Sequence, residues 1–392
     1  MTETFATAAD DAEREQLGLI LSHAFGFPLA EVPLWFERAR FENIRVVRRD
    51  GAVEAGLIVI PMGQFFGGRS VPMTGIAGVG VSTSARGSGV ATRMMQSVVR
   101  ELHEEGVALS TLYPATVPLY QRAGYERAGA RYVTAVNPRE LPTARSTELR
   151  VAPLKDLSDP ALREVYTRFA RDRDGWLDRG PYIWQRIEKP ARNDARAVAI
   201  HGPDGIEGYV VTIHKVADGH DTELTASDVV AVTPRATREA MAILNAYRSL
   251  AGEVRWYGAP NDTLTQSLRD RFHRVTLGDF WMLRLTHVER ALASRGYSPA
   301  LRGAVTFAVS DSVVPENAAT YRVEVDGGEA SVARVEGAGE VTVDVRALAS
   351  MYSGFRRATS LARDGVVHGE SAALRFADAL FASEGPAMSD GF

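Results

Sequence analysis

The most constraining feature of this chain is the segment from Ile76 to Leu102, which combines a strand, a glycine turn and a long helix. The run Ile76–Val81 is apolar, and it is followed by a polar turn and two closely spaced glycines. From residue 90 to residue 102 apolar side chains recur at helical spacing, and charged side chains occupy other positions. This order predicts an α/β unit in which the glycine turn begins the helix.

The glycine turn is a predicted binding site for a pyrophosphate. Backbone N–H groups at a helix N-terminus attract anions together with the helix dipole. Gly87 and Gly89 have no Cβ, so that a phosphate can approach the main chain closely. Arg86 adds a guanidinium that suits phosphate oxygens. The turn is neither a P-loop nor a dinucleotide fingerprint, because it lacks both Gly-Lys-Ser/Thr and G-x-G-x-x-G.

Composition limits the class of protein. With 392 residues, two or three domains are expected. A net charge of −4 gives no general attraction to nucleic acid or to anionic membranes. The absence of cysteine excludes disulfides and thiolate catalysis, and the 8 histidines show no ligand spacing, so no metal is expected. No apolar run is long enough to span a bilayer and no signal peptide is evident, so we expect a cytoplasmic protein.

The N-terminal part has the pattern of one α/β unit. A helix is expected at Ala12–Ala24, and Pro28 and Pro33 interrupt the helical pattern after it. The strands expected in this unit, in chain order, are Ile44–Val47, Ala55–Met62, Ile76–Val81, Ala108–Tyr113 and a last strand near Tyr132–Asn137.

After a polar connector at residues 138–146, a second block repeats the same order of elements. Helices are expected at Pro160–Arg171, Tyr182–Arg186 and Arg238–Leu250, and strands at Arg196–His201, Gly208–His214 and Leu224–Val232. The turn at residues 233–237 contains no glycine, and Pro234 has no N–H group to offer an anion. We therefore expect a second unit of the same kind without the phosphate site.

From about Ser298 the pattern changes to that of an α+β layer. Strands are expected at Gly303–Val309, Thr320–Val325, Glu329–Val335 and Glu340–Asp344, and helices follow at Val345–Tyr352, Thr359–Asp364 and Ser371–Ala382.

Two motifs resemble those of the GNAT acetyltransferases. The pattern Arg-x-x-Gly-x-Ala at residues 86–91 resembles their acyl-coenzyme A pyrophosphate loop, and Leu119–Tyr125 resembles a later tyrosine-containing element. The segments Ser310–Asn317 and Leu348–Tyr352 resemble the sterol-carrier-like C-terminal domain of one GNAT subfamily. Over essentially the whole chain, this combination resembles the Eis (enhanced intracellular survival) family of GNAT N-acetyltransferases from actinobacteria.

The resemblance implies a domain order and an activity. Residues 1–140 would form a catalytic GNAT domain, residues 147–295 a degenerate GNAT-like domain that has lost coenzyme A binding, and residues 296–392 a sterol-carrier-like domain. Members of the family transfer acetyl groups from acetyl-CoA to amines of aminoglycosides and to lysine side chains of peptides or proteins. They assemble as hexamers, and we accordingly expect a homohexamer that binds neither nucleic acid nor membrane.

The resemblance also implies residue roles. Tyr120 corresponds to the general acid, and the carboxylate of Phe392 corresponds to the general base. Some relatives carry several consecutive arginines in the loop where this chain has Arg86-Gly87-Ser88. The residues expected to bind acetyl-CoA are Val79, Gly80, Val81, Arg86, Gly87, Ser88, Gly89, Val90, Ala91, Thr92, Ala115 and Thr116.

Alternative interpretations remain open from the sequence. Tyr120 is also compatible with a half-buried packing residue, and most C-termini have no catalytic role. The sterol-carrier-like domain is compatible with a non-enzymatic carrier of lipids or small molecules. A GNAT scaffold that only senses acetyl-CoA is a third possibility, and it predicts cofactor binding without turnover.

Overall fold

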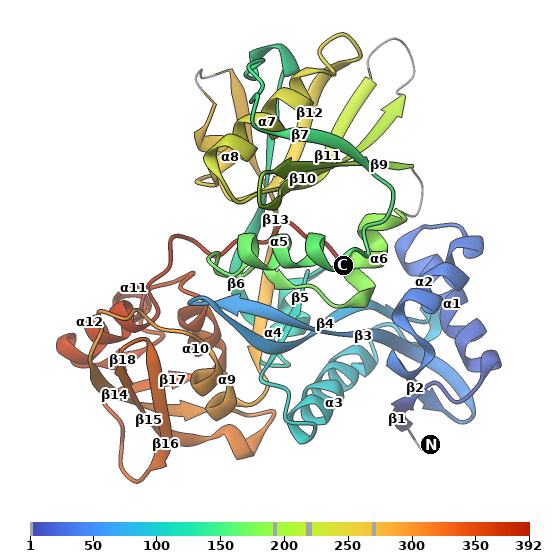
Figure 1. The fold of residues 1–392 in the computed structure, drawn as a ribbon. Helices are drawn as coiled ribbons and strands as arrows, with labels where there is room; N and C mark the ends of the chain where they lie inside the picture. Colours follow the sequence, from blue (N-terminus) through green and yellow to red (C-terminus); the bar gives the residue numbers. More distant parts are fainter. Residues whose placement is uncertain (1–2, 191–193, 217–221, 269–271) are drawn as a thin grey trace. The chain divides into compact units, whose positions relative to one another are not determined.

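The computed structural model describes residues 3–190, 194–216, 222–268 and 272–392. The chain forms two compact units (Figure 1). The first unit contains residues 1–129, 280–384 and 392, and the second contains residues 130–279 and 385–391. The chain passes from one unit to the other within the strands β6 (Glu126–Val136) and β13 (His273–Leu285).

The N-terminal half of the first unit is built on a sheet with the strand order β1-β2-β3-β4-β5-β13. Neighbouring strands are antiparallel except β4 and β5, which are parallel. The helix α3 provides the crossover between these two and packs on β3 and β4. The bounds are β1 Glu3–Thr7, α1 Asp11–Phe25, α2 Val32–Ala39, β2 Ile44–Arg49, β3 Ala52–Phe66, β4 Arg69–Val81, α3 Val90–Glu104, β5 Leu109–Leu112 and α4 Val117–Gln121.

Local signals explain where these helices begin. The Asp10 side chain accepts a hydrogen bond from the Glu13 N–H and so caps α1, which ends at Gly26 with φ of 66°. The expectation that Pro33 would interrupt helical structure is wrong, because α2 begins at Val32 and holds this proline in its first turn. A first-turn proline is tolerated because its missing N–H would have no partner within the helix.

The C-terminal half of the first unit is an α+β layer, as expected from its sequence pattern. Its sheet has the order β16-β15-β14-β17-β18, with the central pair β14 and β17 parallel. The bounds are α9 Val288–Ser294, β14 Gly303–Ser310, β15 Ala319–Asp326, β16 Glu329–Val335, β17 Val341–Asp344, α10 Val345–Tyr352, α11 Ala358–Arg363, β18 His368–Gly369 and α12 Ser371–Leu380.

A buried arginine fills the interior next to this layer. Arg295 is 2% exposed, and its guanidinium donates hydrogen bonds to the carbonyl oxygens of Gly296 and Tyr352. Its guanidinium carbon lies 4.8 Å from the ring centre of Tyr352 and 5.1 Å from that of Phe381. Cation–π contacts are strongest where water is excluded, so the guanidinium stabilises this core.

We expect Arg295→Ala to lower the free energy of unfolding of the first unit by about 2–4 kcal/mol, because it opens a cavity and removes the hydrogen bond from Arg295 to the Tyr352 carbonyl. Chemical denaturation followed by tryptophan fluorescence measures the change. Arg302→Ala is the control, since the side chains of Arg302 and its partner Asp326 are 76% and 75% exposed and such pairs contribute little. Equal stability of the two variants would contradict the structural role of Arg295.

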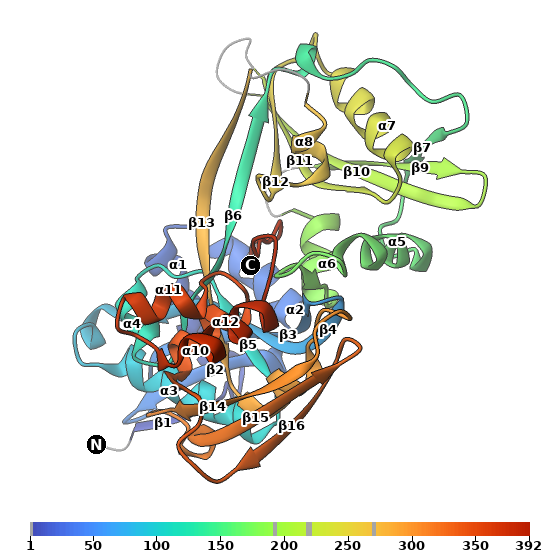
Figure 2. The same cartoon turned by 90° about the vertical axis from the view of Figure 1, so that its left-hand side faces the viewer.

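The second unit repeats the architecture of the N-terminal sheet, with the strand order β6-β12-β11-β10-β9-β7. Here β11 and β12 are the parallel pair, and α7 connects them and packs on β10 and β11 (Figure 2). The bounds are β7 Arg150–Leu154, α5 Pro160–Ala170, β8 Leu177–Asp178, α6 Pro181–Glu188, β9 Ala195–Gly202, β10 Gly205–Val216, β11 Thr222–Ala231, α7 Pro234–Asn245, β12 Ala251–Gly258 and α8 Thr263–Gln266.

The last strand of each sheet comes from a part of the chain other than the one its sequence order suggests. Residues 132–136 were expected to complete the first sheet, but they pair with β12 in the second unit, from Val254↔Val136 to Gly258↔Tyr132. The first sheet is completed instead by the end of β13, whose residues Met282–Leu285 pair with β5. The sequence pattern identifies these two strands but not their partners, because either strand could pair with the open edge of β5.

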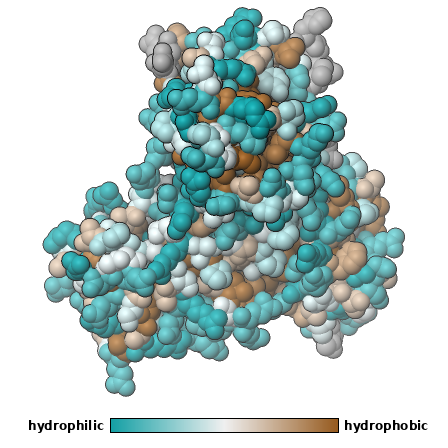
Figure 3. Space-filling model, viewed as in Figure 1, coloured by the Kyte–Doolittle hydropathy of each residue, from teal (hydrophilic) through white to brown (hydrophobic). Residues whose placement is uncertain are grey.

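Most of the surface on view in Figure 3 is hydrophilic, and hydrophobic residues form smaller patches. Exposed large hydrophobic side chains occur on and between α1 and α2, namely Leu19, Phe25, Leu29 and Leu34. In the part of the chain that the structure describes, no helix combines the length and apolar character needed to cross a membrane.

Candidate active site

The candidate site begins where two parallel strands of the first unit separate. β4 and β5 pair over only three positions, from Met73↔Leu109 to Gly75↔Thr111. β4 continues to Val81, and its opposite edge stays paired with β3 as far as Val81↔Ala55. Within the described residues, the edge of β4 after Gly75 that faces away from β3 therefore has no partner strand. Its N–H and C=O groups are available to an extended ligand.

A β-bulge bends β4 within this open segment. The register with β3 shifts between Gly56 and Ile58, opposite Gly78. Gly78 has φ of 60°, which favours glycine, and a Cβ there would lie 2.8 Å from the Trp35 ring. A bulge re-aims backbone groups and increases local twist, which accounts for the divergence of β4 from β5.

The glycine turn lies after β4 and leads into α3. Gly87 and Gly89 have φ of 80° and 81°, and the space around a Cβ at Gly87 is empty to 4 Å. Gly89 is the N-cap residue of α3, and no side chain caps the helix. The first-turn N–H groups therefore keep their donor capacity for an anion, as the sequence predicts.

Two arginines near this turn differ in their ion pairing. Arg93 donates to both carboxylate oxygens of Glu3, at 2.8 and 2.6 Å, and this bonding is the main cause that lowers the pKa of Glu3 to about 2. Arg86 is exposed and has no ion pair with any residue that the structure describes. Arg86 is therefore the guanidinium beside the turn that remains open to a phosphate.

Tyr120 lies in α4, whose N-cap is Thr116. It is 4% exposed, and burial raises the pKa of its phenol to about 12. Its ring meets that of Tyr125 edge-on at 6.4 Å. Its core cluster also contains Ile76 and is packed by Val79 and Val81 of the open segment of β4. Tyr120 is thus a buried phenol, protonated at neutral pH, in the core cluster against which Val79 and Val81 also pack.

Phe392 belongs to the first unit and lies where β4 and β5 begin to separate. Its ring meets the Tyr113 ring edge-on, with centroids 5.7 Å apart. A Cβ built on Gly75, the last β4 residue paired with β5, would lie 2.7 Å from the Phe392 ring. Gly75 therefore leaves room for this ring.

Most of the expected cofactor residues lie on these same elements. Val79, Gly80 and Val81 are on the open segment of β4, and residues 86–92 form the turn and the start of α3. Ala115 and Thr116 lie on the exposed loop that leads into α4. Sequence reasoning did not identify the contribution of Gly75 or the bulge at Gly78, although repeated glycines within a strand are a signal for close approach. No cluster of His, Asp or Glu suited to a metal is found among the described residues.

The corresponding place in the second unit is differently built. The Thr233 side chain caps α7 by accepting from the Ala236 N–H. Thr233 also donates to Glu207 at 2.6 Å, and Arg235 donates to the same carboxylate. A carboxylate thus lies at the helix N-terminus that would face a phosphate.

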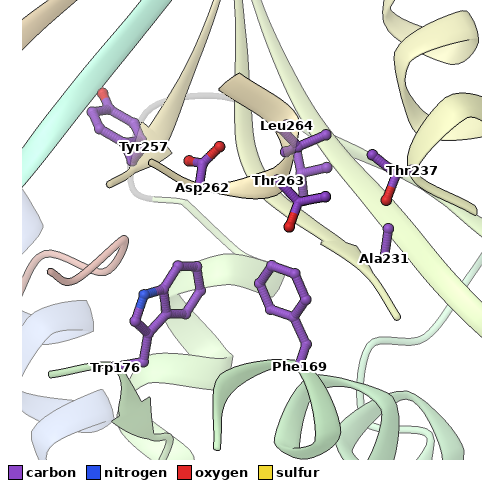
Figure 4. Close-up of a pocket in the computed structure, with 9 residues that line it drawn as sticks. Phe169, Trp176, Ala231, Thr237, Tyr257, Asp262, Thr263 and Leu264 are labelled. Carbon is purple, nitrogen blue, oxygen red and sulfur yellow. The ribbon is translucent and has the colours of Figure 1, made fainter. Parts of the chain in front are cut away.

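The second unit has an open cavity of about 390 Å³ at the end of β11 and the start of α7, and a much smaller pocket lies beside it. Phe169 and Trp176 point toward Asp262 and Thr263 across a small pocket (Figure 4). This small pocket measures about 10 Å³, which is about enough for one water molecule. Burial raises the pKa of Asp262, which caps α8 through the Thr265 N–H.

Comparison with known proteins agrees with this arrangement. The GNAT acetyltransferase domain matches residues 6–128 and again residues 175–285, and the sterol carrier protein domain matches residues 288–389. An uncharacterized N-acetyltransferase of Streptomyces coelicolor is 30% identical, with 95% of each chain covered. The N-acetyltransferase Eis of Mycobacterium bovis is 26% identical, with 88% of each chain covered. The chain belongs to the Eis family of GNAT N-acetyltransferases.

Solved structures of GNAT proteins share the fold over the full length. A GCN5-related N-acetyltransferase from Anabaena variabilis has a TM-score of 0.94 at 30% identity, with 100% of both chains covered. Eis1 from Mycobacterium abscessus has a TM-score of 0.81 at 24% identity, also with 100% of both chains covered, and supports the fold alone. The expected combination of two GNAT-like domains with a sterol-carrier-like domain is confirmed, as is the class of enzyme, an N-acetyltransferase.

Proposed function

We propose that this N-acetyltransferase uses acetyl-CoA bound to the first unit and transfers the acetyl group directly to an amine. The observation that carries this proposal is the open edge of β4 beside an uncapped helix N-terminus. The N–H groups of residues 89–92 and the Arg86 guanidinium would hold the pyrophosphate. The backbone of Val79 and Val81 would pair with the pantetheine arm, with Gly80 between them and Ala115 and Thr116 near its thiol end. The bound cofactor supplies the acetyl group as a thioester.

Two groups of the chain are proposed to move protons. The Tyr120 hydroxyl would donate its proton to the departing sulfur, and its raised pKa keeps it protonated at neutral pH. The Phe392 carboxylate would accept a proton from the attacking amine, which requires that the mature chain end at this residue. The packing of the Phe392 ring against Tyr113 supports this role, because it fixes the residue beside the open strand edge. An N–H of the bulged β4 segment would polarise the acetyl carbonyl.

The proposed acceptors are amines of aminoglycosides, lysine side chains, or both, as expected for the Eis family. We also propose a homohexamer, which multi-angle light scattering of the purified protein tests.

The division at residues 1–140, 147–295 and 296–392 remains part of this proposal. The second unit is proposed not to bind coenzyme A, because Glu207 lies at its α7 N-terminus. The C-terminal layer has a cavity of about 370 Å³ whose lining includes Arg356, Arg357, Arg375 and Asp378, and charged groups of this kind disfavour an apolar lipid chain.

Release of free coenzyme A tests the activity. With acetyl-CoA and either an aminoglycoside or a lysine peptide, a chromogenic disulfide is expected to detect thiol release that depends on the acceptor. Gly87→Ala is expected to raise KM for acetyl-CoA by at least about tenfold, because a Cβ obstructs the close approach of phosphate to the turn.

The matched control is Gly365→Ala. Gly365 also has a positive φ, 72°, and open space around a Cβ, but it lies at the end of α11. Both substitutions carry a similar backbone strain of about 1–2 kcal/mol, so only the variant at the turn should change KM. If none of the tested acceptors gives thiol release, the proposal is contradicted. An equal KM for acetyl-CoA in Gly87→Ala and Gly365→Ala would also count against it.

A further inference from the structure

A buried ion cluster in the second unit holds the end of the chain. Arg179 follows the short strand β8, and its guanidinium binds two carboxylates. Its Nη1 donates to Asp228 Oδ2 at 2.6 Å, its Nε donates to Asp390 Oδ2 at 3.0 Å, and its Nη2 lies 2.9 Å from Asp390 Oδ1. The side chains of Arg179 and Asp228 are 1% exposed and that of Asp390 is 7% exposed. Such geometry gives strong, charge-assisted hydrogen bonds.

Aromatic residues enclose this cluster. The Arg179 guanidinium carbon lies 3.8 Å from the ring centre of Tyr166 and 5.1 Å from that of Trp184. Tyr209 donates its hydroxyl proton to Asp228 at 2.7 Å. The guanidinium is therefore held by rings on its face and by carboxylates along its edges, so it is a rigid partner for Asp390.

The residues before Asp390 are held by backbone hydrogen bonds within the same unit. The N–H of Ala387 donates to Asp174 at 3.1 Å, and the N–H of Met388 donates to Ala130 at 3.2 Å. The Arg131 Nε donates to the carbonyl oxygen of Ser389 at 2.9 Å. Chain ends are commonly disordered unless they are tied down, so this tail is an ordered structural element up to Asp390.

We propose that Arg179 is a positioning residue for acetyl transfer, because it fixes Asp390 two residues before the proposed base. Two residues of extended chain span at most about 7 Å, so a fixed Asp390 restricts Phe392 to a small region. This inference rests on the proposed function of the Phe392 carboxylate. It adds that Arg179, through Asp390, limits the range of positions that the chain end can take.

Asp390→Ala is the principal test variant. It leaves Arg179 paired one-to-one with Asp228, so it avoids an unpaired buried charge, whereas Arg179→Ala would leave two carboxylates without their cation. Tyr209→Phe is the matched control, because it also removes a buried hydrogen bond from the cluster but leaves the bonds between Arg179 and Asp390. A protein that lacks residue 392 completes the set. If Asp390→Ala does not fold, Asp390→Asn replaces it as the principal variant.

The readouts are the rate at which carboxypeptidase A releases Phe392, the steady-state constants and the melting temperature. In Asp390→Ala we expect release of Phe392 to accelerate at least about tenfold, since local opening of the tail becomes easier. We expect kcat to fall roughly 10- to 100-fold, because small displacements of a reacting group have effects of this size. KM for acetyl-CoA should stay at the wild-type value, and Tyr209→Phe should lower the melting temperature without changing release or kcat.

The outcomes separate this inference from the proposed function. Unchanged release of Phe392 in Asp390→Ala would overturn the anchoring role. Faster release with unchanged kcat would overturn the positioning role. The protein without residue 392 then decides whether the Phe392 carboxylate has a catalytic role. If that protein is inactive, the base remains supported and only the inference about Arg179 fails. If it is fully active, the proposed role of the carboxylate fails as well.

Discussion

Tyr120→Phe is expected to lower kcat roughly 10²- to 10⁴-fold, which is the usual contribution of a positioned acid or base. The substitution removes one oxygen and leaves the aromatic ring in its buried place in α4. Within the described residues no hydrogen bond of the Tyr120 hydroxyl is found, so its loss should leave the fold intact. Steady-state kinetics measure kcat, and isothermal titration measures the affinity for coenzyme A, which should not change.

Tyr125→Phe is the matched control for this experiment. Tyr125 is the buried neighbour of Tyr120, and its hydroxyl lies 2.7 Å from the Ser110 hydroxyl. Ser110 keeps its bond to the Thr74 carbonyl when the phenol is removed, so we expect a stability loss of about 1 kcal/mol and nearly full activity. Equal kcat values for the two variants would assign Tyr120 to packing or to a scaffold that only senses acetyl-CoA.

The pH dependence follows from the raised pKa of Tyr120. With a pKa of about 12, the phenol remains protonated throughout the neutral range and loses its proton only as the pH rises toward that value. The ratio of kcat between the wild-type enzyme and Tyr120→Phe should therefore be constant between about pH 6 and pH 9. A ratio that falls as the pH rises within this range would indicate a much lower pKa for the catalytic acid.

Converting the Phe392 carboxylate to an amide is expected to lower kcat at least about 10²-fold, again because a base is removed from the reaction. Semisynthesis with an amidated C-terminal peptide changes a single functional group and keeps the ring against Tyr113. Intact mass of the starting protein first establishes that the chain ends at residue 392. Coenzyme A affinity should remain at the wild-type value, because the phosphate turn is unchanged.

Phe392→Ala separates the carboxylate from the ring. It keeps a terminal carboxylate but removes the contact with the Tyr113 ring and the ring that lies beside Gly75. A smaller loss than that caused by amidation is expected, because the base is still present but less well fixed. Full activity of the amidated enzyme would exclude the carboxylate from the mechanism.

Much of the fold was predictable from local patterns. The strand, turn and helix around residues 76–104 follow from apolar periodicity and glycine position, and the α+β layer follows from alternating strands with tight turns. The hairpin residues Gly67 and Gly68 were missed, and with them the extension of β3 to Phe66 and the start of β4 at Arg69. The bulge at Gly78 was missed as well, because its effect depends on the register with β3.

Contacts between residues distant in sequence were the least predictable part. Nothing near Arg179 in the sequence indicates that Asp390, 211 residues later, shares its ion pair. The structure places the Asp390 carboxylate 2.9 Å from the Arg179 guanidinium. Long-range pairing depends on the assembled fold, since local propensity does not identify partners.

The pairing of β13 with β5 has a consequence for dissection of the enzyme. A truncated protein that ends after the first GNAT match would retain the phosphate turn and Tyr120, but it would expose the edge of β5 that β13 covers. An uncovered edge invites aggregation rather than autonomous folding. Deletion of the apparently redundant second GNAT match, residues 175–285, would therefore also remove the strand Met282–Leu285 that completes the sheet carrying the proposed chemistry.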